Sequence, residues 1–142
     1  MTEKPTKETT PAPPAPAGPA PFGLGLAAWV VPGLGHLLMG KKARAALFFG
    51  TVAILFWLGV VLQGHFTYAD DPVESFALFK FVSHLSAGFH FGIALITGVN
   101  ADAYAMKARF SNEIGATCLY LAGIINLLCV LDAIAIRRGK KE

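Results

Sequence analysis

Charge is scarce in this chain. Aspartate, glutamate, lysine and arginine together make up 15% of the 142 residues, compared with about 25% in a soluble domain. Hydrophobic residues reach 54%, where soluble domains have about 45–50%. The formal net charge is +3, and the basic residues gather next to apolar segments rather than on a surface with interleaved aromatic residues. We therefore expect the protein to have the lipid bilayer as a partner and not to bind nucleic acid.

Cysteine and known catalytic motifs are scarce as well. Cys118 and Cys129 are eleven residues apart in one predicted helix, which separates them by roughly 16 Å at 1.5 Å per residue. A disulfide requires Cα atoms within about 7 Å, so this pair does not bridge within the helix. The sequence contains no P-loop, no nucleophile elbow, no HExxH and no metal-spaced cysteine set. We expect no enzymatic activity, no cofactor and no metal site.

Long apolar runs are what the chain does have. Crossing about 30 Å of hydrocarbon takes about 20 helical residues, and residues 43–64 and 114–136 meet that length with one charge each. Residues 76–99 form a third run, and residues 22–40 form a shorter fourth run that is broken at Pro32. This pattern predicts an all-α integral membrane protein with about four transmembrane or re-entrant helices and short loops.

The domain boundaries follow from the same runs. Residues 1–21 are rich in proline and alanine and predict a disordered tail. We place the helical transmembrane domain at 22–137 and a basic tail at 138–142, with a polar turn at 65–75. Four crossings would put the basic clusters near residues 41–44 and 137–141 on opposite sides of the membrane. The two sides would then carry six and five cations, so the positive-inside rule gives no more than a weak preference for both termini inside.

The fourth run contains an unusual break. Proline removes a backbone donor and clashes with the preceding helical turn, and glycine allows close backbone approach and unusual dihedral angles. Two interpretations remain open: a kink that packs tightly against other spans, or a polar, ion-handling site around the histidine and the freed carbonyl groups. The residues of this motif are Pro32, Gly33, Gly35, His36, Gly40 and Lys41.

A few polar and small residues lie inside the other apolar runs. His84 and His90 are about 120° apart on a helix, so they do not readily share a metal ion. Gly88 and Gly92 form a G-x-x-x-G pattern that predicts a helix-packing face. The polar intramembrane residues are His84, His90, Asn126 and Asp132. We interpret Asn126 and Asp132 mainly as contacts between helices, with a proton or ion relay as the alternative, and expect Arg137 or Lys41 to neutralise Asp132.

Two stretches are similar to known membrane proteins. "PGLGHLLMGKKARAALFF" resembles the glycine-rich first half of the TM-two domain, a two-helix membrane module, and departs from it at residues 37–39, where an aromatic pair is usual. "EIGATCLYLAGIINLLCVLDAIAIRRGKK" is similar to the end of an uncharacterised bacterial family of small membrane proteins. The residues that match this second pattern are Ala122, Gly123, Asn126, Leu127, Leu128, Leu131, Asp132 and Ala133. The resemblance implies a related fold and a bacterial setting, and it implies no activity.

Two functions fit these features. The first is a structural, scaffold or accessory protein that packs with itself, as a homo-oligomer, or with a larger membrane complex. This first function is supported by the number of small residues available for helix contacts, which are Gly50, Gly59, Gly88, Gly92, Gly115 and Gly123. The second is a small transporter or channel that handles ions or protons through His36, His84, Asn126 and Asp132. Either would be a multi-pass protein of the cell membrane, in a bacterium the inner membrane.

Overall fold

The computed structural model describes residues 20–69, 75–99 and 110–139, so most of the two predicted tails lies outside the described residues. The described residues form helices and the turns between them, without a strand. The helices are α1 (Pro21–Val30), α2 (Leu34–Leu38), α3 (Lys42–Val61), α4 (Ala77–Ser86), α5 (Phe89–Thr97) and α6 (Phe110–Arg137).

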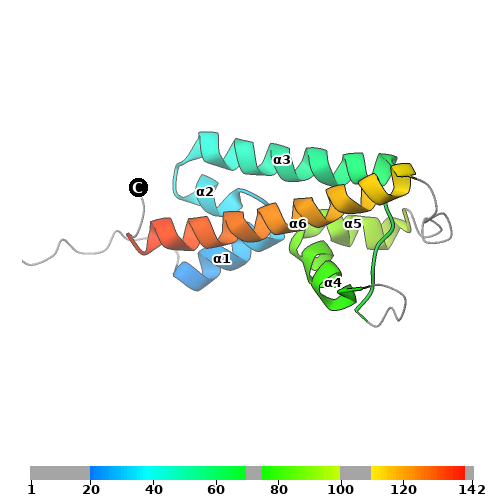
Figure 1. Cartoon of the computed structure of the whole chain (residues 1–142). Coiled ribbons are helices and arrows are strands. Elements are labelled where there is room, and N and C mark those ends of the chain that lie inside the picture. Colours follow the sequence, from blue (N-terminus) through cyan, green and yellow to red (C-terminus); the bar gives the residue numbers. More distant parts are fainter. Residues whose placement is uncertain (1–19, 70–74, 100–109, 140–142) are drawn as a thin grey trace, which may run out of the picture.

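Helix α6 is the central element of the fold. It packs against α3, α1 and α4, and it runs antiparallel to α3 along the length of the molecule (Figure 1). Close packing is possible because small residues dominate the buried face of α6. A Cβ atom on Gly115 would lie 2.9 Å from the Gly59 oxygen of α3, so the two backbones meet almost without side chains between them. The buried residues of α6 are Asn112, Gly115, Ala116, Leu119, Ala122, Gly123, Asn126, Cys129 and Ala133.

Both of the remaining apolar runs are broken near their middle. In the first, α1 ends at Val30 and α2 begins at Leu34, which confirms the break expected at Pro32. In the second, the single helix expected over residues 76–99 is wrong, because α4 and α5 meet at an angle of 103°. Gly88 lies at this second break with φ of +66°, a conformation that only glycine adopts readily.

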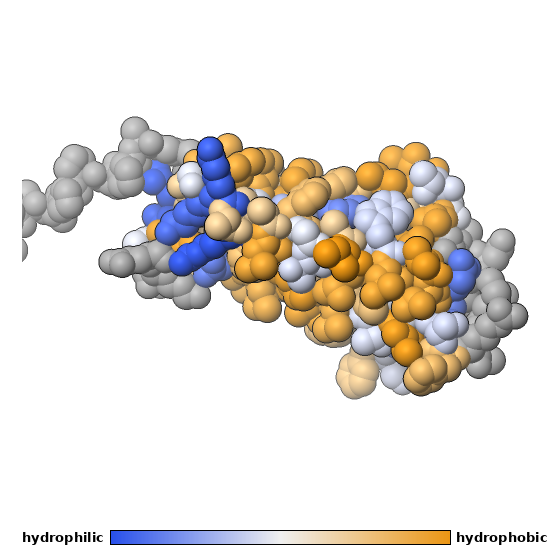
Figure 2. Space-filling view, turned by 90° about the horizontal axis from the view of Figure 1, so that it is seen from above, coloured by the Kyte–Doolittle hydropathy of each residue, from blue (hydrophilic) through white to orange (hydrophobic). Residues whose placement is uncertain are grey.

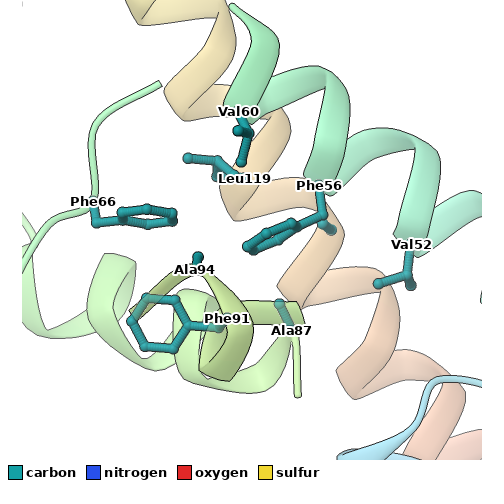
Figure 3. Packing of buried hydrophobic residues seen from close by; sticks show 9 residues of the cluster. Val52, Phe56, Val60, Phe66, Ala87, Phe91, Ala94 and Leu119 are labelled. Carbon is teal, nitrogen blue, oxygen red and sulfur yellow. The ribbon is translucent and has the colours of Figure 1, made fainter. Parts of the chain in front are cut away.

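The hydrophobic core lies where these elements meet. The larger cluster joins α3, α5, α6 and the segment after α3, with Phe56, Phe66 and Phe91 packed together (Figure 3). A smaller cluster of Leu24, Ala28 and Ala133 joins α1 to α6. The polar turn expected at 65–75 is therefore partly wrong, because its first residues are buried in the core. Helix α6 also begins at Phe110, before the expected start at 114.

Two described helices, α3 and α6, are long and apolar enough to cross a membrane, and the bent pair α4–α5 makes a third if it counts as one span. The four spans expected from the sequence are not confirmed, because α1 is only 10 residues long and α2 only 5. The face of the molecule drawn in Figure 2 is largely apolar between its two ends.

The largest group of strongly hydrophilic residues on the face drawn in Figure 2 lies at one end of the molecule. Because α3 and α6 are antiparallel, the beginning of α3 and the end of α6 both lie at that end (Figure 1). This places Lys42 and Arg44 at the same end of the molecule as Arg137 and Arg138. Four unbroken crossings would have put the two basic clusters at opposite ends of the molecule, whereas the packed helices put them at one end.

Candidate functional site

Buried polar side chains line the inner face of helix α6. All four histidines of the chain are buried, with at most 2% of their surface exposed. Each of His36, His65 and His84 makes a side-chain hydrogen bond to another element. In a membrane interior, such groups are costly unless the protein itself supplies their partners. The hydrogen-bond partners of these side chains therefore show which parts of the fold each of them connects.

Asn126 joins the two helix breaks. Its side-chain amide donates to the main-chain oxygens of Trp29, at 3.0 Å, and Ser86, at 2.7 Å. Trp29 is in the last turn of α1 and Ser86 ends α4, and carbonyl groups in the last turn of a helix have no partner within that helix. One asparagine thus satisfies the ends of two half-helices that enter the centre of the molecule from different directions (Figure 1).

Gly88 completes this junction from the second break. A Cβ atom there would overlap the main-chain oxygens of Trp29 and Val30. The close approach requires glycine for this reason as well as for its positive φ. On the same face of α6, about one turn before Asn126, a Cβ atom on Gly123 would overlap the main-chain oxygen of Ser83 in α4. Helices α1, α4 and α6 therefore meet at backbone contact distance around Asn126.

His36 makes a second polar contact with α6, nearer the basic end of that helix. Its Nε2 is 3.1 Å from Oδ2 of Asp132, and its Nδ1 is 3.6 Å from Sγ of Cys129. A neutral imidazole that donates from Nε2 to the carboxylate leaves Nδ1 to accept the thiol proton. His36 is fully buried, whereas 21% of the Asp132 side chain is exposed. The sequence did not predict this contact of Asp132 with a histidine, and the expected neutralisation of Asp132 by Arg137 or Lys41 stays a prediction.

The segment after α3 contributes polar residues that sequence reasoning missed. The backbone N–H of Thr67 donates to Nε2 of His84 at 3.2 Å, and the Thr67 hydroxyl is 3.1 Å from the Tyr120 hydroxyl. His65 Nδ1 lies 3.1 Å from Oδ1 of Asn112. A polar stretch next to Asp and Pro resembles an ordinary turn, so no local signal marked these residues as buried.

His84 and His90 have different surroundings. Since Nε2 of His84 accepts from Thr67, its proton resides on Nδ1, which has no hydrogen-bond partner among the described residues. The His90 ring instead contacts the rings of Phe49, Phe56 and Phe89. The described residues contain no group of three His, Cys, Asp or Glu side chains placed to hold a metal ion.

The motif around Pro32 lies against α3 and α6. Gly33 has φ of +81°, and a Cβ atom on it would overlap the Ala45 oxygen of α3. A Cβ atom on Gly35 would lie 2.9 Å from the Ala28 Cβ atom and 3.1 Å from that of Ala133. Gly40 also has positive φ but open space around it. Lys41 follows at the start of α3 and donates its backbone N–H to the His36 oxygen.

The two glycines of the G-x-x-x-G pattern have separate roles. Gly88 is at the helix break and contacts α1, as described above, whereas a Cβ atom on Gly92 in α5 would meet no atom within 4 Å. They do not share one packing face inside this chain, because the break at Gly88 rotates α5 away from the line of α4.

These features define a class: an all-helical protein with helices long and apolar enough to cross a membrane, and with a hydrogen-bonded polar interior. The chain belongs to the family of unknown function DUF6677, whose model matches residues 24–142. That description names neither the TM-two domain nor a bacterial source, so both remain predictions. No curated protein and no solved structure matches the chain.

Proposed function

We propose that this protein is a structural or accessory component of the cell membrane that associates with itself or with a larger membrane complex through the outer faces of α3 and α5. The observation that carries the proposal is that some glycines lie against another element of this chain, whereas others have open space around them. Gly59, Gly88, Gly115 and Gly123 each meet backbone atoms of another element of the chain. A Cβ atom on Gly50 or on Gly92 would meet no atom of the described residues within 4 Å.

Gly50 belongs to a row of small residues on the outer face of α3. Ala43, Ala46, Gly50 and Ala53 lie within about 80° of one another around the helix, and each is exposed or half-buried. The buried residue Val52 lies about 100–180° around the helix from the members of this row, on the side of α3 that packs against α6. Rows of small residues allow close contact between membrane helices.

Gly92 lies on a neighbouring surface. Phe49, next to Gly50, stacks on Phe89 of α5 with ring centroids 6.3 Å apart. Phe89 is three residues before Gly92, so the open glycines of α3 and α5 are on adjoining helices. A helix of a second protein could contact both, and this supports an association surface rather than two unrelated positions.

A topology in which α3 and α6 are the two complete membrane crossings is compatible with this association surface. The chain leaves α3 and enters α6 at the same end of the molecule (Figure 1), which requires an even number of crossings between them. We infer that α4–α5 is a re-entrant pair from that end and that α1–α2 is a re-entrant pair from the basic end. The positive-inside rule then places the basic end, with both termini, in the cytoplasm.

The association proposal is tested by Gly50→Leu in detergent-purified full-length protein, with mass measured by light scattering and by chemical crosslinking in membranes. We expect a loss of the oligomer or of the co-purifying complex, because the larger side chain separates the helices. Gly23→Leu is the matched control, since Gly23 is also helical and also has open space around it. Association that is unchanged in Gly50→Leu, or equally reduced in Gly23→Leu, would refute the proposal.

A second function is favoured by the pair of His36 and Asp132. A buried imidazole in contact with a partly exposed carboxylate can pass a proton toward the basic end. If the protein relays protons, proteoliposomes should show a proton flux that Asp132→Asn reduces. Flux that is absent in the unaltered protein would eliminate this function and leave the association proposal intact.

A further inference from the structure

A groove opens beside the first helix break. It has a volume of about 370 Å³ and lies between the 31–37 segment and the first two turns of α3. Its walls are apolar side chains, among them Val31, Leu34, Leu37 and Phe49, and Lys42 is at its edge. The groove exists because the break turns the chain at Pro32 and because Ala45 and Ala46 leave space on α3.

The residues of α3 that line the groove change from charged to apolar along the helix. Lys42 is its first residue, and Ala45, Ala46 and Phe49 follow at the spacing of one helix face. Seven residues rise about 10 Å, so the groove extends from the charged end of a candidate span toward its interior. An amphiphile would match this order, with its anionic head at the charged end of the groove and its apolar chain toward the interior.

The surroundings favour an anionic head in particular. Lys41, Lys42 and Arg44 lie within four residues of one another, and Arg137 and Arg138, where α6 ends, lie at the same end of the molecule (Figure 1). Clusters of cations next to a membrane span attract anionic lipids. A zwitterionic lipid would bring its own positive charge into this field, and a wholly apolar ligand would not use Lys42.

We propose that this groove binds an anionic phospholipid, with one acyl chain in the apolar part and the phosphate at the Lys42 ammonium. The proposal rests on the membrane location argued above, and because Ala46 and Phe49 also belong to the proposed association surface, lipid binding is measured separately from the oligomeric state. The bound lipid would fill the space between α2 and α3 and join the first broken helix pair to the candidate span α3.

The test measures lipid binding by native mass spectrometry of the full-length protein in a neutral detergent. Phosphatidylglycerol and phosphatidylcholine with identical acyl chains are compared, and inorganic phosphate is added as a competitor. We expect phosphatidylglycerol to bind and phosphatidylcholine to bind at least about fivefold more weakly, which is the effect of one cation near an anionic headgroup. Equal binding of both lipids, or displacement of the lipid by millimolar phosphate, would overturn the proposal.

Two pairs of variants locate the site. Lys42→Gln should weaken phosphatidylglycerol about fivefold, whereas Arg138→Gln, at the same end but outside the groove, should change it less than about twofold. Ala46→Phe should fill the groove and abolish binding, whereas Ala43→Phe adds the same bulk on the exposed part of α3 outside the groove and should retain it. Lipid binding that survives Ala46→Phe refutes the site, and a monomeric protein that still binds lipid refutes only the association proposal.

Discussion

The strongest test of the fold is the replacement of Asn126, because this one side chain serves both helix breaks. Asn126→Leu keeps a branched side chain of the same general shape but removes the two donors to the Trp29 and Ser86 oxygens. Both oxygens then remain at the ends of half-helices in the interior, where no other described side chain donates to them. We expect the free energy of unfolding to fall.

The magnitude follows from two limits. Hydrogen bonds between membrane helices contribute about 0.6 kcal/mol on average, so losing two gives a lower limit of about 1 kcal/mol. A buried acceptor that is left without a donor costs about 1–3 kcal/mol, so two such acceptors give an upper limit near 6 kcal/mol if neither half-helix moves. A reduction of about 1–6 kcal/mol is therefore expected.

Unfolding by dodecyl sulfate in mixed micelles measures this change, and tryptophan fluorescence reports on the junction itself when Trp57→Phe leaves Trp29 as the one tryptophan of the chain. Leu127→Ala is the control, because Leu127 is the next residue of α6 and is 44% exposed. Hydrogen exchange should also become faster at the ends of α1 and α4 and stay unchanged in the middle of α3. If Asn126→Leu is no less stable than Leu127→Ala and exchange at both breaks is unaltered, Asn126 does not hold the breaks and the reasoning fails.

Two further predictions concern close contacts. Gly123→Ala should cost about 1–3 kcal/mol, as overpacking does, because its Cβ atom would overlap the Ser83 oxygen, whereas Gly92→Ala should stabilise α5 by up to about 1 kcal/mol; equal thermal stability of the two variants would contradict this. A double-mutant cycle with His36→Leu and Asp132→Asn should give a coupling of about 0.6–1.7 kcal/mol. Additive effects on unfolding would show that the pair contributes nothing.

The sequence determined the two long helices and the first break. Whether a run is long and apolar enough to cross lipid is a property of consecutive residues, so α3 and α6 could be located directly. The break at Pro32 is also local, because the missing N–H and the ring clash belong to that residue alone. The polar residues His84, His90, Asn126 and Asp132 could be named in the same way, since they interrupt apolar runs.

The partners of those residues were decided by the tertiary structure. Asn126 bonds to Trp29, 97 residues away, and His36 to Asp132, 96 residues away. The break at Gly88 depends on the Trp29 and Val30 oxygens that approach it, whereas the same G-x-x-x-G letters are compatible with one continuous helix. The meeting of the basic clusters likewise required the antiparallel packing of α3 and α6. Local composition limits which backbone groups need a partner, but only the packed chain brings a particular partner within hydrogen-bond distance.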